Sequence, residues 1–77
     1  GIIKNNKTRN ADFKNASIFV QSDVKIGKNA IIEDKVVLRG ATAVLDNYAT
    51  INADVELVND TCTFNNYGTV TGQIIKP

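Results

Sequence analysis

Residues 32–50, IEDKVVLRGATAVLDNYAT, and residues 51–69, INADVELVNDTCTFNNYGT, align with each other without a gap. Residues 13–31, FKNASIFVQSDVKIGKNAI, precede them in the same frame, and residues 70–77 begin a further copy. An ungapped repeat is typical of solenoids, in which each repeat stacks on its neighbours. The sequence therefore predicts a stack of coils, each 19 residues long.

Each copy contains three pairs of apolar positions, a smaller residue followed two positions later by a larger one. Residues two apart in a strand point to the same face, so each pair predicts a short strand with both side chains in the core. The larger residues are Phe13, Phe19, Ile26, Ile32, Leu38, Leu45, Ile51, Leu57, Phe64 and Val70. The smaller ones are Ala11, Ser17, Val24, Ala30, Val36, Ala43, Ala49, Val55, Cys62 and Gly68. Three strands per coil predict an all-β, single-stranded, three-sided parallel β-helix of about three to three and a half coils.

The segments between these strands are rich in Asn, Asp and Gly, which tolerate turn and left-handed conformations. They are predicted to form the corners of the prism. An antiparallel β-sandwich is the alternative, but hairpins would not give an ungapped period. The β-helix is expected to span residues 11–77. Residues 1–10 are expected to form an N-terminal tail or cap, because Lys7 occupies a core column and breaks the pattern.

Composition and charge exclude several classes of function. A chain of 77 residues makes one small domain, and its net charge of +1 gives no field that would attract nucleic acid. No apolar run approaches the ~20 residues of a membrane span. Gly1 stands where a Met would begin a chain, so we expect a piece of a longer protein. The sequence leaves the compartment open.

The residue types that carry catalysis are almost absent. The chain has no histidine and one cysteine, so it lacks a zinc site of the usual Cys/His kind, and it has no glycine-rich phosphate loop. Cys62 shares its column with Val24 and Ala43, which predicts a core residue rather than a nucleophile. We expect no catalytic residue, no metal site and no cofactor, and hence a protein that is not an enzyme.

Two families resemble parts of the repeat. The hexads IGKNAI, IEDKVV and LRGATA of residues 26–43 resemble hexapeptide repeats, which implies a left-handed β-helix of the acyltransferase type. That family uses a catalytic histidine and an 18-residue period, and this chain has neither. Residues 62–64, CTF, and 68–74, GTVTGQI, are similar to coils of bactofilins, which are bacterial polymers with right-handed β-helices. Phage tail spikes and bacterial adhesins carry comparable coils, which implies a bacterial or phage structural context. The sequence leaves the hand open, with a lean to the left because the small/large rule is kept so strictly.

The outer surface offers a candidate site for assembly. One side of the prism is predicted to turn a largely apolar stripe outward, and such a stripe usually marks a contact, although Val and Ile are also good strand formers. The ends of a solenoid also expose unpaired backbone groups, and Pro77 cannot extend a ladder. The candidate assembly face consists of Ile18, Val20, Val37, Arg39, Val58 and Ile75.

The favoured function is a non-catalytic structural module, a rod that forms a homo-oligomer or docks to other domains of its parent protein. A trimer and an end-to-end polymer are both compatible with the pattern. One alternative is the β-helix of a hexapeptide-type transferase whose catalytic residues lie elsewhere. A minor alternative is a ligand- or ice-binding solenoid, because the pairs Thr61/Thr63 and Thr69/Thr71 do not recur in earlier coils. Tyr48 and Tyr67 share a corner column and are positioned to stack.

Overall fold

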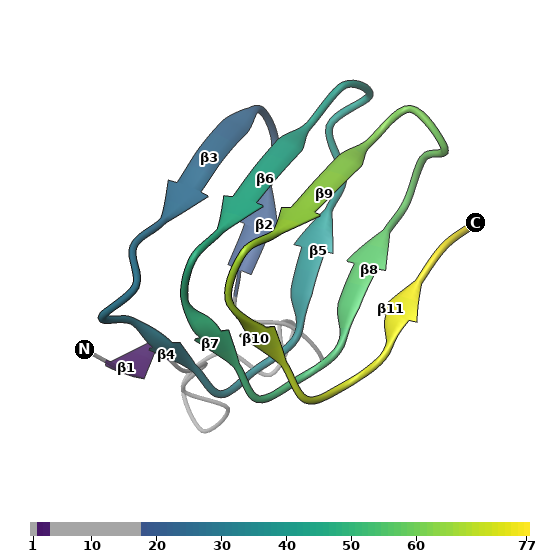
Figure 1. The fold of residues 1–77 in the computed structure, drawn as a ribbon. Helices are drawn as coiled ribbons and strands as arrows, with labels where there is room; N and C mark the ends of the chain where they lie inside the picture. Colours follow the sequence, from purple (N-terminus) through teal and green to yellow (C-terminus); the bar gives the residue numbers. More distant parts are fainter. Residues whose placement is uncertain (1, 4–17) are drawn as a thin grey trace, which may run out of the picture.

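The computed structural model describes residues 2–3 and 18–77, and within them it is built from short strands (Figure 1). The predicted strand 11–13, Ser17, and the tail or cap of residues 1–10 apart from residues 2–3 lie outside the described residues. In chain order the strands are β1 Ile2–Ile3, β2 Ile18–Val20, β3 Asp23–Ile26, β4 Ile31–Ile32, β5 Val36–Leu38, β6 Val44–Asn47, β7 Thr50–Ile51, β8 Val55–Leu57, β9 Thr63–Asn66, β10 Thr69–Val70 and β11 Ile74–Ile75.

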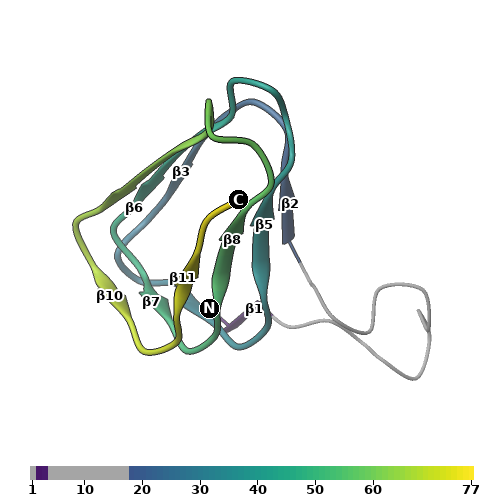
Figure 2. The same ribbon diagram turned by 90° about the vertical axis from the view of Figure 1, so that its right-hand side faces the viewer.

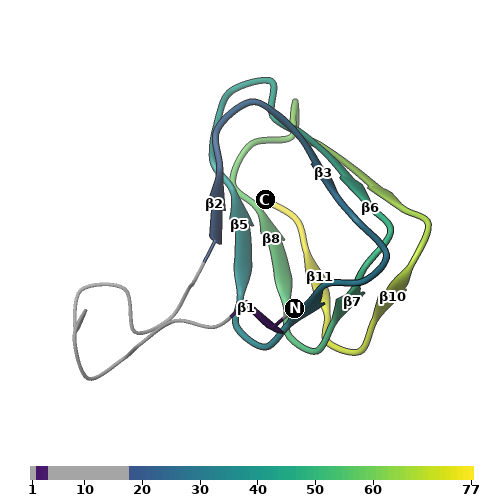
Figure 3. The same ribbon diagram turned by 90° about the vertical axis from the view of Figure 1, so that its left-hand side faces the viewer.

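Consecutive strands lie on different sides of the molecule, which gives the coil its three-sided outline (Figures 2 and 3). The three sheets have the strand orders β1-β4-β7-β10, β11-β8-β5-β2 and β3-β6-β9. Every strand pair within them is parallel. The predicted three-sided parallel β-helix of about three coils is therefore confirmed. No helix in the described part of the chain has the length and apolarity to cross a membrane.

The second and third coils keep the predicted period of 19 residues. Ile32 pairs with Ile51, and Ile51 pairs with Val70 on the next coil. Stacking in register places like side chains above one another, so each apolar column becomes a continuous part of one core. The core residues from these columns with at most 8% exposure are Ile26, Ile32, Val36, Leu38, Ala43, Leu45, Ala49, Ile51, Val55, Leu57 and Cys62.

The first coil departs from the period, and this overturns part of the predicted orientation. Ile18 pairs with Val36, 18 positions later, rather than with Val37. A slip of one residue turns every side chain of a strand to the opposite face. Ile18 and Val20, predicted to point outward, therefore face the core, where Val20 is only 1% exposed. Phe19, predicted to point inward, is in register with the outward Val37.

The cause of this error lies in the local sequence. Ile18, Phe19 and Val20 are all apolar, so the strand has no alternation that would select one face. With the slip, two β-branched aliphatic side chains enter the core. Phe19 moves to the outer side, where the guanidinium of Arg39 lies 4.8 Å from the centre of its ring. A cation over an aromatic face is a favourable contact, which stabilises the alternative register.

The corners turn without left-handed residues. No described residue has a positive φ, so the predicted reason for the Asn- and Gly-rich corners is wrong. Glycine is needed there for space instead. A Cβ added at Gly40 would collide with the backbone carbonyl oxygen of Gln21, and one added at Gly68 would collide with that of Ala49. These glycines allow one coil to approach the backbone of the coil beneath it.

We expect Gly40→Ala to lower the free energy of unfolding by about 1–3 kcal/mol, the usual cost of overpacking. The added methyl group meets backbone, which cannot move aside without disturbing the ladder. Gly27→Ala is the matched control, since nothing lies within 4 Å of a Cβ at that position. Urea titrations followed by circular dichroism measure both. Equal stability of the two variants would contradict close stacking at Gly40.

Candidate functional site

The predicted assembly face is only partly assembled in the structure. Val37, Glu56 and Ile75 lie in one outward column across β5, β8 and β11. Arg39 and Val58 follow β5 and β8, and both are exposed, Val58 to 45%. Ile18 and Val20 face the core, as described above. The role of this face in assembly stays a prediction.

Charge interrupts the apolar stripe at its centre. Glu56 stands between Val37 and Ile75, and its carboxylate lies 2.6 Å from the Nζ of Lys35. Both side chains are about one-third exposed, so the pair contributes little to stability. Val37 itself is only 8% exposed. The side of the rod therefore offers less continuous apolar surface than the sequence pattern indicated.

A polar ladder occupies one corner of the core. Asn47, at the end of β6, is fully buried, and its side-chain oxygen accepts a hydrogen bond of 3.1 Å from the N–H of Ala49. Its Nδ2 donates to the carbonyl oxygen of Ala49 at 3.1 Å and to Oδ1 of Asn66 at 2.9 Å. Oδ1 of Asn66 also accepts from the N–H of Gly68. The ladder ties the corner of the second coil to that of the third.

Sequence reasoning assigned these asparagines to a corner but did not predict their burial. The available signal was their identity in the same column, one coil apart. Beside them a second amide bridges the same two coils, since Nδ2 of Asn65 donates to Asp46 at 2.9 Å. These bonds are structural, because they satisfy polar groups of the stack itself.

An aromatic column lies outside the same corner. The rings of Tyr48 and Tyr67 are stacked with centroids 4.9 Å apart and planes inclined by 20°. The stacking predicted from their shared column is confirmed. The Nζ of Lys25 lies 5.0 Å from the centroid of the Tyr48 ring, so a cation ends the column on the first coil. On the last coil Tyr67 is 63% exposed.

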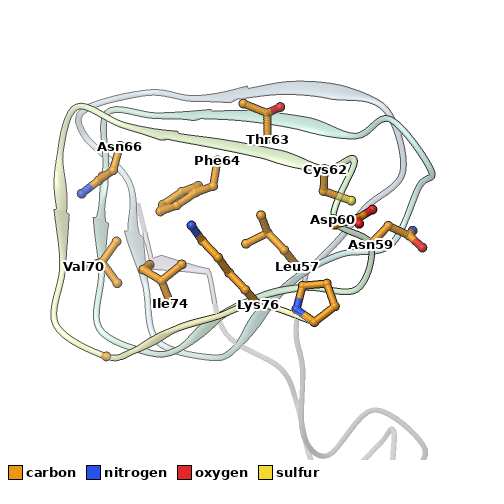
Figure 4. Close-up of a pocket in the computed structure, with 12 residues that line it drawn as sticks. Leu57, Asn59, Asp60, Cys62, Thr63, Phe64, Asn66, Val70, Ile74 and Lys76 are labelled. Atoms are coloured by element: carbon orange, nitrogen blue, oxygen red, sulfur yellow. The ribbon is translucent and has the colours of Figure 1, made fainter.

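The C-terminal end of the rod opens into a hollow of about 740 Å³ (Figure 4). Its apolar lining comes from Leu57, Phe64, Val70 and Ile74, which the last coil turns toward its centre. Ile74 is 41% exposed, although it is in register with the fully buried Val55. Polar and charged side chains surround the lining, among them Asn59, Asp60, Thr63, Asn66 and Lys76.

Strand edges border this hollow. Strands β9, β10 and β11 are each the last strand of their sheet. In a parallel ladder alternate backbone groups point to opposite neighbours, and the N–H groups of Thr69 and Thr71 bond back to the preceding coil. The groups between them face away from the stack. The end therefore combines an uncovered core with strand edges that are suitable for pairing with another chain.

Cys62 belongs to the floor of the last coil rather than to a reactive site. Its thiol is 7% exposed, and Sγ lies 3.0 Å from the carbonyl oxygen of Gly40. The predicted core position of this residue is confirmed. Among the described residues, no three His, Cys, Asp or Glu side chains are grouped so that they could hold a metal ion.

No family model matches the chain, and neither a curated protein nor a solved structure matches it. The resemblances to hexapeptide repeats, bactofilins and phage or adhesin coils stay predictions from the sequence, and so does the winding hand. The geometry of the rod and its end is therefore the basis for a functional proposal.

Proposed function

We propose that this chain is a non-catalytic structural module, a β-solenoid rod that assembles with another copy of itself through its C-terminal end. The observation that carries the proposal is the hollow in the last coil, with its apolar lining and bordering strand edges. Apolar surface exposed in one contiguous area favours association. The strand edges add the hydrogen-bonding groups by which chains extend each other's sheets.

The end of the rod is a better assembly surface than its side. At the end, Ile74 exposes 41% of its surface in a concave apolar lining. On the side, the outward Val37 is 8% exposed, and the neighbouring Glu56 is charged and paired with Lys35. More apolar area is therefore removed from water when the end is covered, and the free energy of association rises with that area.

The absence of catalysis is part of the proposal. The sequence contains no histidine to act as a general base. Its single thiol is buried and directed at the carbonyl oxygen of Gly40, without a neighbouring base. The polar side chains in the described coils instead bond from one coil to the next, as Asn47 does with Asn66. Such groups support a stack rather than a reaction.

We expect Ile74→Lys to abolish self-association, because docking a second surface on the hollow would bury a charge without a partner. Ile31→Lys is the matched control. Ile31 is an isoleucine of similar exposure, 38% against 41%, but it lies in the outward column of β4, away from the hollow. Light scattering after size exclusion, at several concentrations, measures the mass of each variant. Association that survives Ile74→Lys, or that is lost equally in Ile31→Lys, would contradict docking at this end.

A further inference from the structure

The two ends of the rod differ in how completely the core is covered. In the first coil, Val20 and Ile26 are 1% and 8% exposed, and Val24 keeps 37% of its surface. In the last coil, Phe64 and Val70 are only half-buried and Ile74 is 41% exposed around the hollow. The larger uncovered apolar area is therefore at the C-terminal end.

The two corner ladders also end differently. On the first coil, Ile26 takes the column of Asn47, and the ammonium group of Lys25 lies over the ring of Tyr48. On the last coil, the columns end in Asn66 and in Tyr67, whose ring is 63% exposed. The first coil therefore offers no amide to continue the asparagine ladder. Stacking it on the C-terminal end of another copy would set an aliphatic side chain against Asn66.

We propose, on the basis of the function proposed above, that two copies join C-terminal end to C-terminal end in a closed two-fold pair. A contact between identical surfaces is self-complementary and cannot grow further. Each hollow then covers the apolar lining of the other. One opposite charge on each rim supports this arrangement, because Asp60 and Lys76 both line the hollow and a two-fold axis exchanges them between copies. The pairing is a dimer, not a polar filament.

Cross-linking distinguishes the ends directly. In a Cys62→Ala background, single cysteines are placed at the exposed Gln73 of the last coil and at the exposed Ser22 of the first coil. Circular dichroism verifies that each variant is folded, and light scattering verifies that each associates like the parent. With a short bis-maleimide, Gln73→Cys is expected to give one product of two chains. Ser22→Cys alone, and the mixture of both variants, are expected to give none.

Each other outcome of the cross-linking overturns a defined statement. Products joining Gln73→Cys to Ser22→Cys, with a series of larger species, would show head-to-tail stacking and overturn the closed pair while leaving assembly through the C-terminal end intact. A multiple-chain mass without cross-links at either position would place the contact on the side of the rod and overturn docking at this end. A mass of one chain throughout would overturn the proposed function itself.

Charge reversal provides a test that does not depend on cysteine placement. Lys76→Asp alone sets like charges against Asp60 in the second copy, and we expect the dissociation constant to rise about tenfold. The double variant Lys76→Asp with Asp60→Lys restores opposite charges in both symmetry-related contacts and is expected to recover the parent affinity. Sedimentation equilibrium measures all three. A double variant that dimerises no better than the single one would overturn the two-fold arrangement.

Discussion

Replacing Ile51 by alanine is expected to lower the free energy of unfolding by about 2–5 kcal/mol, the range for large-to-small changes in a core. Ile51 is fully buried in the middle coil, between Ile32 below it and Val70 above it. Both neighbours are held by their own ladders, so the cavity cannot collapse easily. A chain of 77 residues has a total stability of about 4–12 kcal/mol, which makes this loss a large fraction.

Urea unfolding measures this loss at a concentration where light scattering gives the mass of one chain, because association would add to apparent stability. Thr50→Ala is the control, since Thr50 precedes Ile51 in the same strand but points outward and is half-buried. We expect that variant to change stability by no more than about 0.5 kcal/mol, as surface substitutions usually do. A loss below about 1 kcal/mol for Ile51→Ala would contradict a core shared between coils.

Replacing Asn47 by alanine is expected to cost about 1–3 kcal/mol, although the change removes no apolar packing. The side chain is fully buried and supplies both partners of the Ala49 backbone, accepting from its N–H and donating to its carbonyl oxygen. Ala49 is itself 1% exposed, so water cannot replace these bonds without opening the corner. The cost is that of leaving buried polar groups without partners.

Asn66→Ala is the matched variant for Asn47→Ala. Asn66 occupies the same column on the last coil and takes part in the same ladder, but it is exposed. Water can satisfy the groups that it leaves, so we expect a cost of about 0.5–1.5 kcal/mol. The same urea titration compares the two. If the exposed variant were as destabilised as the buried one, the ladder would not owe its energy to burial.

The second and third coils could be predicted from sequence because several independent columns agree. Val36 and Val55, Leu38 and Leu57, and Leu45 and Phe64 each repeat with the same period, and each pair is in register in the structure. A repeat in which every column is apolar has only one way to bury them all. The pattern therefore fixed the strand positions to within one or two residues.

The first coil could not be predicted in the same way, because its sequence does not select one register. Its β2 is apolar throughout, so a shift of one residue costs no core contact, and the shift reversed Ile18, Phe19 and Val20. In β3 the offset to the next coil is larger, and Ile26 aligns with Asn47. The period alone cannot show such local insertions, which the adjoining corners absorb.

The candidate sites show the same limits. The stacking of Tyr48 on Tyr67 follows from their column, but the burial of Asn47 does not, because asparagine at a corner is usually solvated. The hollow at the C-terminal end depends on how the last coil closes around Phe64 and Ile74, which is a property of three-dimensional packing. The predicted lateral face failed where the register slipped.

The most direct test of the account is the mass of the unmodified chain by sedimentation equilibrium over a wide range of concentrations. The account predicts a rise from one chain to two, with a plateau at two, because the pairing of C-terminal ends is closed. A mass of one chain over the entire range would contradict assembly, and the chain would then be a rod whose hollow is not covered by a second copy.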